Sequence, residues 1–373
     1  MTGVKIAGVG IYPFGRHGDI TATRMGAIAV RDALAEAGPG LAPEAAFCGT
    51  AYGGVAAGHR VMGELARTGI PIVDIEAGCA SGAAALSMAA GAIRAGQYRA
   101  VLVFGIEKMP KGIIRSSFFA PWQEQLGLAA TPAYFALRSQ RLMIDSGVTK
   151  DHLAQVVVKN RSNGVDNVHA MFRKPVSVAE VLASKVVCEP LHLFMLCSPN
   201  EGAAAVVLTA GDDGVQLRAC ALRSHLPGHV LNEGSPLAGL LGADVDPPTV
   251  LAARDAYEAA GLGPEDLDVL ECQDTDAARE LLAYEELGLC EPGGSAAHLE
   301  SGVPLLTGRQ PVNPSGGLLS KGEPLGASAL GQIVELTRQL QGQAGTRQVE
   351  GARIALAQTI GRGANASVTI LSR

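Results

Sequence analysis

The stretch DIEAGCASGAAALSMAAGAI, residues 74–93, places one cysteine, Cys79, between an apolar run and a series of small residues. The run at residues 70–76 predicts a buried strand, and the alanine-rich residues 80–95, which contain no proline, predict a helix. A second strand is predicted for AVLVFGIE at residues 100–107. A strand, a tight turn, a buried helix and another strand are typical of a parallel α/β layer, with Cys79 in the turn.

Similar patterns lie on both sides of this unit in the first half of the chain. Residues 4–12 predict a strand, residues 22–37 a helix that a Gly-Pro pair ends, and residues 202–211 a core strand. Residues 108–200 differ, because they are richer in aromatic and charged residues. We expect residues 108–200 to form an excursion that covers the sheet, and not a separate domain.

A second half begins near residue 214 and repeats the alternation of strands and helices. The predicted strands are residues 215–224 and 266–274 with a hairpin at 353–373, and the predicted helices are residues 249–262, 278–289 and 328–342. Because strand and helix follow in a similar order in both halves, we expect a duplicated α/β protein. The expected division is residues 1–213 and 214–373.

The composition excludes several classes of protein. Of the 373 residues, 47% are hydrophobic, which is enough to fill a large core. The 30 basic and 36 acidic residues are spread without blocks, so the net charge of −6 predicts neither a nucleic-acid partner nor binding to a membrane surface. The N-terminal residues lack the pattern of a signal peptide, and no apolar run is long enough to span a membrane. A soluble, cytoplasmic protein is expected.

The residues that usually bind metals or cofactors are scattered. The seven cysteines form no CxxC pair, and the eight histidines include no HExxH motif, so we predict neither a disulfide framework nor a metal site. The glycine-rich segments do not form the GxGxxG pattern of a dinucleotide site. No bound cofactor is therefore expected.

Four separated stretches together resemble the thiolase superfamily, and within it the branch of sterol-carrier-protein-like and archaeal-type thiolases. They are DIEAGCASGAAAL, FRKPVSVAEVLASKVVCEPLHLF leading to EGAAAVVL, LLAYEELGLCEPG, and NPSGGLLSKGEPLGASALGQ. The resemblance covers nearly the whole chain. It implies the thiolase fold, in which two similar five-stranded mixed sheets are layered with helices as α-β-α-β-α. It also implies a homodimer and a coenzyme A (CoA) thioester as substrate.

By this resemblance Cys79 corresponds to the acyl-accepting cysteine of the family. The chemistry of its position agrees, because the free N–H groups at the start of a helix favour the charged thiolate, the nucleophilic form. Ser81 and Gly82 keep the turn small, so a thioester carbonyl can approach while backbone N–H groups point at its oxygen. The alternative is a cysteine that only packs at the start of an alanine-rich helix.

The chain departs from the family at three acid-base positions. Glu323, in SKGEPLGAS, occupies the place of a histidine. In ECQDTDAARELL, Gln273 stands at another histidine position and Asp274 at the aspartate position that follows it. In AQTIGRGA, Gln358 and Thr359 stand where the family has a cysteine or a His-Asn pair. The predicted nucleophile is retained while the groups that normally move protons are replaced.

These departures predict an altered catalytic set of Cys79, Glu323 and Gln273. Glu323 can act as a base if burial raises its pKa, and Gln273 can offer an N–H to the substrate oxygen. The backbone of Gly361 and Gly363 is also predicted to contribute to the oxyanion site. The alternative for Glu323 is a solvated glutamate, or one paired with its neighbour Lys321.

The resemblance further implies that the excursion over residues 108–200 receives the pantetheine arm of the substrate. His169 is therefore predicted as a substrate contact, and Arg173 with Lys174 as contacts to the CoA phosphates. A solvated face is the alternative for the two basic residues.

Three functions remain open from the sequence. The first is an acyltransferase that makes or breaks a carbon–carbon bond in a CoA or carrier-bound thioester through acyl-Cys79. The second is a CoA-dependent retro-aldolase in which Glu323 or a tyrosine moves the proton. The third is a non-catalytic subunit. Thiolase-like proteins with altered acid-base sites often work with a small partner that has a zinc ribbon and an oligonucleotide-binding-type (OB-fold) barrel, so the resemblance also implies such a partner.

Overall fold

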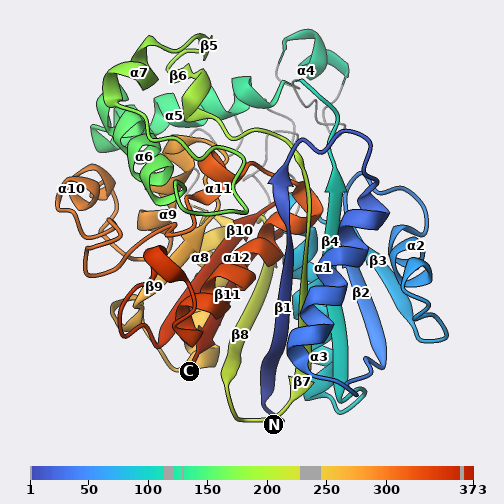
Figure 1. The fold of residues 1–373 in the computed structure, drawn as a ribbon. Coiled ribbons are helices and arrows are strands. Elements are labelled where there is room, and N and C mark those ends of the chain that lie inside the picture. The colour runs from blue at the N-terminus through green and yellow to red at the C-terminus, as the bar shows by residue number, and fades with distance from the viewer. Residues whose placement is uncertain (1, 113–120, 128–129, 227–244, 362–364) are drawn as a thin grey trace.

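The protein is described by a computed structural model that covers residues 2–112, 121–127, 130–226, 245–361 and 365–373 (Figure 1). The first half contains β1 (Val4–Gly15), α1 (Ala22–Ala37), β2 (Ala45–Gly49), α2 (Ala57–Glu64), β3 (Ile72–Ile75), the 3₁₀ turn η1 (Gly78–Ala80), α3 (Ser81–Arg94), β4 (Ala100–Lys108) and β7 (Glu201–Ala210). The excursion between β4 and β7 contains α4 (Pro121–Gln125), α5 (Thr131–Ser146), α6 (Lys150–Asn163), α7 (Val178–Ala183), β5 (Val186–Cys188), β6 (Leu191–His192) and the 3₁₀ turn η2 (Leu193–Met195).

The second half contains β8 (Val215–Ser224), α8 (Pro248–Ala260), η3 (Pro264–Asp266), β9 (Val269–Cys272), α9 (Ala277–Glu286), α10 (Ser295–Glu300), α11 (Gly317–Lys321), α12 (Leu325–Gln341), η4 (Gly345–Arg347), β10 (Ile354–Ile360) and β11 (Asn365–Ser372). The described strands of both halves form one nine-stranded mixed sheet in the order β3-β2-β4-β7-β1-β8-β11-β10-β9. Only two residue pairs, Lys5 with Gln216 and Ile6 with Val215, join β1 to β8 at the boundary between the halves.

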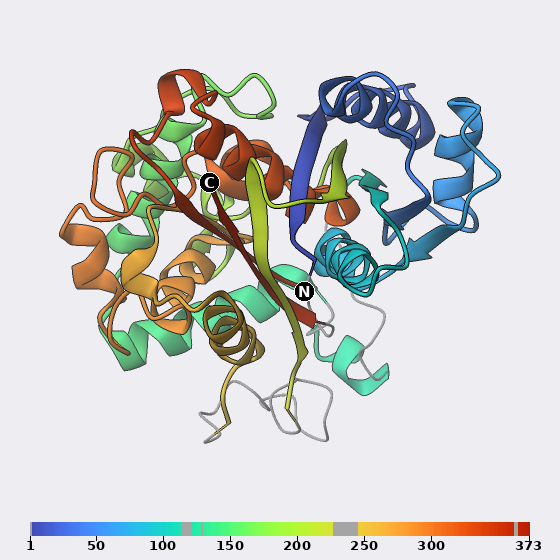
Figure 2. The ribbon, with the colours of Figure 1, turned by 90° about the horizontal axis from the view of Figure 1, so that it is seen from below.

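The helices form layers around the two parts of this sheet, as the predicted fold class requires. Helices α3 and α12 pack against each other and against strands of both halves. Helix α1 packs on β1, β7 and β4, and α8 packs on β8 and β11. Seen from below, the blue elements of the first half lie on one side and most yellow to red elements of the second half on the other (Figure 2). The α-β-α-β-α arrangement is confirmed.

The number of strands differs between the halves. The first half supplies five strands to the sheet, as the resemblance implies. Within the described residues the second half supplies four strands. A fifth strand would continue the sheet beside β9, but within the described residues only a single bridge, between Leu270 and Val312, lies there. A proline on each side of this segment, at 311 and 314, interrupts the backbone donors that a longer strand needs.

Local sequence explains where α1 begins and why α12 lies close to the sheet. The Thr21 side chain caps α1 by accepting a hydrogen bond from Arg24 N (3.1 Å), and the helix spans the predicted residues. At Gly105 in β4, an added Cβ would lie 2.0 Å from the carbonyl oxygen of Gly326. Glycine at this strand position therefore lets the start of α12 approach β4, which brings the segment before α12 next to the Cys79 turn.

The excursion shares a hydrophobic core with the second half. Phe135 and Leu142 of α5 and Val157 of α6 belong to the same buried cluster as Leu281 and Tyr284 of α9. In Figure 1 these green elements cover one end of the sheet, opposite the N-terminus. Among the described residues, no helix combines the length and the apolar character that crossing a membrane requires.

Candidate active site

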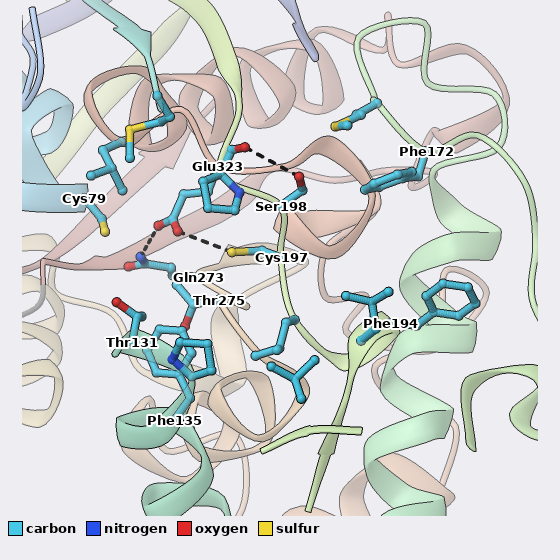
Figure 3. Close-up of a pocket in the computed structure, with 18 of the residues that line it drawn as sticks. Cys79, Thr131, Phe135, Phe172, Phe194, Cys197, Ser198, Gln273, Thr275 and Glu323 are labelled. Carbon is cyan, nitrogen blue, oxygen red and sulfur yellow. Dashed lines mark hydrogen bonds between the residues drawn. The ribbon is translucent and has the colours of Figure 1, made fainter. Parts of the chain in front are cut away.

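A large cavity lies where the excursion covers the end of the sheet (Figure 3). Its volume is about 1740 Å³, and residues from the first half, the excursion and the second half line it. Cys79, Gln273 and Glu323 all lie on its wall, so the structure brings together the three side chains that the sequence predicts to be catalytic.

Cys79 occupies the short 3₁₀ turn η1 that leads directly into α3. Gly78 has φ +58°, a conformation that favours glycine, and it starts the turn. The hydroxyl of Ser81 accepts from Ala77 N (2.9 Å) and donates to the carbonyl of Gly78 (2.6 Å). This local clamp fixes the turn, and the half-buried thiol of Cys79 faces the cavity.

Glu323 lies in the turn between α11 and α12 and is buried. Its carboxylate accepts hydrogen bonds from Gln273 Nε2 (2.8 Å) and from the Cys197 thiol (3.3 Å). Burial raises the pKa of Glu323 from its ordinary value of 4.5, and the Cys79 thiol, the Cys197 thiol and the Gln273 amide oppose that shift only in part. The carboxylate thus lies among two thiols and an amide.

Gln273 follows β9 and is held in one orientation. Its Oε1 accepts from the backbone N–H of Ile360, so its Nε2 must face Glu323. Its own backbone N–H donates to Gln358 Oε1 (3.1 Å). In the described part of the chain, the second N–H on Nε2 has no protein acceptor, and it can donate to a substrate oxygen.

Cys197 is the residue of this cluster that sequence reasoning missed. It lies in LCSPNEGAAA, just before β7, and it lines the cavity. Burial raises the pKa of Cys197 well above its ordinary value, and the charge of Glu323 adds to the shift. This thiol therefore stays protonated at neutral pH. The only sequence signal was a cysteine at the end of a loop that leads into a core strand.

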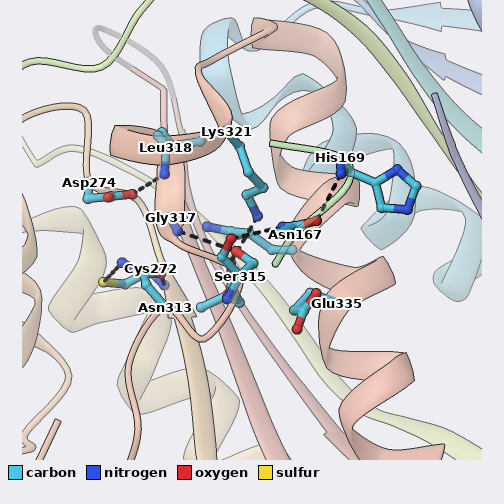
Figure 4. A network of polar contacts seen from close by, with 12 residues as sticks. Asn167, His169, Cys272, Asp274, Asn313, Ser315, Gly317, Leu318, Lys321 and Glu335 are labelled. Atoms are coloured by element: carbon cyan, nitrogen blue, oxygen red, sulfur yellow. Dashed lines mark hydrogen bonds and ion pairs between the residues drawn. The ribbon is translucent and has the colours of Figure 1, made fainter. Parts of the chain in front are cut away.

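A buried polar network supports the segment that carries Glu323 (Figure 4). Asp274 accepts from the backbone N–H groups of Leu318 (2.6 Å) and Leu319 (3.2 Å), and so fixes α11. Lys321 pairs with Glu271 (3.1 Å), with both side chains almost completely buried. Glu323 is buried and Lys321 pairs with Glu271, so the alternative of a solvated or salt-bridged surface glutamate beside Lys321 is wrong.

A second buried carboxylate, Glu107 at the end of β4, joins the two halves at the cavity wall. It accepts from the backbone N–H groups of Ala51 (2.9 Å), Tyr52 (3.0 Å) and Gly326 (3.1 Å). Ala51 and Tyr52 line the cavity, and Gly326 belongs to the first turn of α12. Glu107 thus holds a first-half loop against the helix that follows Glu323.

The other residues predicted for the site are placed as follows. Gly361 lines the cavity, but its N–H donates to the carbonyl of Asn365 (2.8 Å), which leaves it unavailable to an oxyanion. Gly363 lies outside the described residues. Gln358 bonds to Thr249 Oγ1 (3.3 Å) and Thr359 to Gln332 Oε1 (2.8 Å), so both are buried in the strand and do not line the cavity.

Arg173 lies on the exposed rim of the cavity together with Lys174, where the sequence predicts CoA contacts. His169 is not among the residues that line it, and its ring points away from the network drawn in Figure 4. Its backbone N–H donates to Asn167 Oδ1 (3.0 Å), and burial lowers the pKa of its imidazole. A substrate contact by His169 stays a prediction that this position does not support.

Within the described residues, no group of three or more His, Cys, Asp or Glu side chains is arranged to hold a metal ion. The chemistry available at the site is that of a thiol, a carboxylate base and an amide donor. A thiol beside a buried carboxylate can be deprotonated as it attacks a carbonyl carbon. The arrangement is therefore chemically able to support a cysteine nucleophile.

Comparison with known proteins shows the family of the chain. Residues 4–212 match the family "Thiolase, N-terminal domain", and residues 245–373 match "Thiolase C-terminal domain-like". The chain belongs to the thiolase family of acyltransferases and lyases.

Curated relatives are similar over most of the chain. Sterol carrier protein 2 of Oryctolagus cuniculus is 35% identical over 98% of this chain and 71% of that protein. Acetyl-CoA acetyltransferase of Methanothermobacter thermautotrophicus is 35% identical over 100% of both chains. Benzoylsuccinyl-CoA thiolase subunit BbsB of Thauera aromatica is 32% identical over 98% of this chain and 96% of that protein.

Solved structures show the same fold at lower identity. The Ltp2-ChsH2(DUF35) aldolase has a TM-score of 0.86 at 22% identity, covering 99% of this chain and 97% of that one. The Acat5 thiolase of Ascaris suum, in complex with coenzyme A, has a TM-score of 0.72 at 19% identity over 100% of both chains.

Proposed function

We propose that the protein cleaves or forms the carbon–carbon bond of a 3-ketoacyl-CoA through an acyl-Cys79 intermediate, with Glu323 as the base. The observation that carries the proposal is the carboxylate of Glu323, which lies near the Cys79 thiol on the cavity wall and is buried enough to have a raised pKa. An enclosed carboxylate of this kind takes the part that histidine has elsewhere in the family.

In the cleavage direction, Glu323 takes the proton of Cys79 while the sulfur attacks the ketone carbon. Gln273 Nε2 donates to the oxygen that becomes negative. The bond between the ketone carbon and the next carbon then breaks, and the acyl group stays on Cys79. A CoA thiol attacks this acyl group and gives its proton to Glu323, which returns it to the leaving Cys79 thiolate. Condensation follows the same steps in reverse.

The carbon released from the broken bond also needs a proton, and Cys197 supplies it in this proposal. Its thiol lines the cavity and donates to the Glu323 carboxylate, which also lies near Cys79. Because its raised pKa keeps it protonated, Cys197 suits a proton donor better than a second nucleophile. Protonated Glu323 restores the Cys197 thiol before the CoA thiol attacks, so the carboxylate is free again to accept the proton of CoA.

The size and rim of the cavity support a CoA thioester as substrate. Its volume of about 1740 Å³ exceeds the roughly 300–1,000 Å³ of pockets for drug-sized ligands, which leaves room for a pantetheine arm with an acyl group. Arg173 and Lys174 on the exposed rim provide positive charge for phosphates.

The direct test is to trap the intermediate. Incubation with 3-ketoacyl-CoA and an acid quench should give an acyl adduct on Cys79 in peptide mass spectrometry. Without substrate, iodoacetamide at neutral pH should alkylate Cys79 before Cys48, Cys272 and Cys290, because burial raises the pKa of the first two thiols well above the ordinary value and that of Cys290 to about 12. An adduct on another cysteine, or none, would contradict the proposal.

A retro-aldolase is the second candidate, because tyrosines as well as Glu323 line the cavity. Tyr52 lies close enough to Cys79 for their charges to interact, and Tyr134 is on the wall formed by the excursion. In that reaction a 3-hydroxyacyl-CoA would be cleaved to a carbonyl compound and a shorter acyl-CoA without an acyl-enzyme. Formation of these products by a Cys79→Ala variant would favour the aldolase.

We also propose a homodimer and, for the aldolase alternative, a small zinc-ribbon partner. One structural neighbour is an aldolase of two components, Ltp2 and ChsH2(DUF35), and one relative is a thiolase subunit, which supports a partner. The dimer is supported by β3, the edge strand of the sheet. In β3 the carbonyls of Pro71 and Ile75 bond to β2. The backbone groups of the alternating residues Ile72 and Asp74 therefore point away from the sheet, where a second strand can pair with them.

The dimer can be tested with one charge on this edge. Val73 on β3 is 39% exposed in the single chain, and in a symmetric pair its substitution Val73→Lys places two like charges near each other. Light scattering should give a dimer for the wild type and a monomer for Val73→Lys. Ile144→Lys on α5, where the side chain is 78% exposed, is the matched control and should remain dimeric. A monomeric wild type would refute the assembly.

A further inference from the structure

Arg161 of α6 places a buried cation on the cavity wall, away from the catalytic cluster. It is 7% exposed, and its guanidinium lies 4.1 Å from the ring centre of Phe172 and 5.7 Å from that of Phe194. Arg161 and both rings line the cavity, and Figure 3 shows the two rings across it from Cys79.

This arginine differs from the other buried or half-buried arginines of the cavity in having no anionic partner. Arg16 lies 3.5 Å from Glu201, and Arg138 pairs with Asp276. Over the described residues, no carboxylate or carbonyl pairs with Arg161, and its Nε has no hydrogen-bond partner. Burial lowers the pKa of Arg161 to about 10, so its guanidinium remains charged at neutral pH.

The helix that carries Arg161 is fixed by its opposite face. Lys159 donates to Val312 O (2.7 Å) and pairs with Glu280 (2.9 Å), and Asn160 donates to Asp274 (2.8 Å). Phe172 and Phe194 also hold the guanidinium plane. Arg161 cannot therefore move to a protein acceptor without losing these contacts, and the charge is positioned in advance for an anion that enters the cavity.

A buried charge without a partner is costly to the folded protein, and a ligand anion offsets that cost. The planar guanidinium can donate two parallel hydrogen bonds to a carboxylate, while the rings favour an apolar chain beside it. The phosphates of CoA carry several charges and meet exposed Arg173 and Lys174 at the rim. Arg161 is instead enclosed, which suits a single small anion.

Resting on the proposed function, we propose that Arg161 selects acyl-CoA substrates whose acyl group carries a second, terminal carboxylate. The reacting carbonyl lies at Cys79, the acyl chain follows the cavity, and its carboxylate meets Arg161 between Phe172 and Phe194. The protein would then act on dicarboxylic acyl-CoA thioesters in preference to simple fatty acyl-CoA of equal length.

The test compares glutaryl-CoA with pentanoyl-CoA, which have the same number of acyl carbons and differ in the terminal carboxylate. Calorimetric titration of the full chain should give about tenfold or more tighter binding of glutaryl-CoA, the effect of a charged hydrogen bond. Arg161→Met should abolish this preference by weakening glutaryl-CoA alone, with free CoA unaffected. Arg173→Met, the control at the rim, should weaken all three ligands to a similar extent.

The other outcomes of this titration lead to different conclusions. Equal binding of both acyl-CoA compounds by the wild type overturns the role of Arg161 and leaves the proposed function intact. Loss of free CoA binding in Arg161→Met assigns Arg161 to a CoA phosphate and also overturns the role. If the wild type binds no CoA compound, the proposed function fails together with this inference.

Thermal unfolding without ligand provides an independent measure. Because Arg161 is unpaired, Arg161→Met should have a Tm equal to or above that of the wild type. A structural arginine would behave in the opposite way, so a Tm lowered by several degrees overturns the proposal. Should the variant fail to fold, the ratio of the two affinities in the wild type still decides.

Discussion

Replacing Cys79 with alanine is expected to lower the rate of acyl transfer by at least about 10⁴-fold, the scale on which enzymes lose turnover when a covalent nucleophile is removed. The substitution deletes only the sulfur, and the clamp formed by Ser81, Ala77 and Gly78 does not involve it. We therefore expect the fold and the affinity for acyl-CoA to persist, as circular dichroism and titration can check.

Cys290→Ala is the control for this experiment, because Cys290 does not line the cavity. It should retain full activity. Cys197→Ala should occupy an intermediate position, with a normal acyl adduct on Cys79 and a slower exchange of solvent deuterium into the released acyl-CoA. If Cys79→Ala kept wild-type turnover of a 3-ketoacyl-CoA, acyl-Cys79 could not be an intermediate.

Glu323→Gln should lower turnover by roughly 10²-fold or more, the usual contribution of a general base, while acyl-CoA binding survives. The amide has nearly the same volume, and its oxygen can still accept from a thiol. In the wild type the rate must rise with pH as Glu323 ionises, and burial moves this limb above the ordinary glutamate range, since it raises the pKa from 4.5. The pH profile of the variant should lack that limb.

The stability of the folded protein should also depend on pH through Glu323, and the raised pKa of this group sets the direction of that dependence. Because the folded state raises the pKa of Glu323, unfolding releases a proton between pH 4.5 and the higher folded value. The contribution of this group to stability is present in full below pH 4.5 and is lost as pH rises through the folded pKa. Glu323→Gln, which is neutral throughout, should therefore be at least as stable as the wild type at pH 7.

Glu323→His separates two origins of the altered site. If the chain is an ordinary thiolase in which glutamate has simply replaced the histidine, a histidine at position 323 would restore the usual base and raise the rate of acyl transfer. In a site rebuilt around a carboxylate, the imidazole would lack the acceptor that Cys197 and Gln273 need, and activity would fall. We expect the fall, because the Cys197 thiol and the Gln273 amide both donate to the carboxylate. Unchanged turnover in both Glu323 variants would show that another group moves the proton.

The regular elements were predictable because their patterns are local. The helix at residues 22–37 and the strand at residues 215–224 have the predicted bounds, since apolar period and flanking glycines determine both. The first strand was predicted to end at residue 12 but continues to Gly15, because β7 supplies a partner as far as Glu201. Pairing with a strand that is distant in sequence leaves no pattern in the residues themselves.

The site was predictable only in part, for the same physical reason. Cys79, Gln273 and Glu323 lie in recognisable motifs, and the fold brings them together. Cys197 and Arg161 belong to no such motif, and what distinguishes them is burial and the identity of their neighbours. The occupied N–H of Gly361 likewise follows from its pairing with Asn365, which only three-dimensional structure reveals.

The carboxylate of Glu323 connects segments that are far apart along the chain, because Cys197 is 126 positions away. Glu107 contacts Gly326, which is 219 positions away. Contacts between such distant segments form slowly, because closing a long loop costs entropy before any contact repays it. By the proposed function, a nascent chain that has folded only its first half therefore has the proposed nucleophile but not the proposed base. Such a chain would become competent for this chemistry only when its last third docks, and an incomplete chain would not consume acyl-CoA.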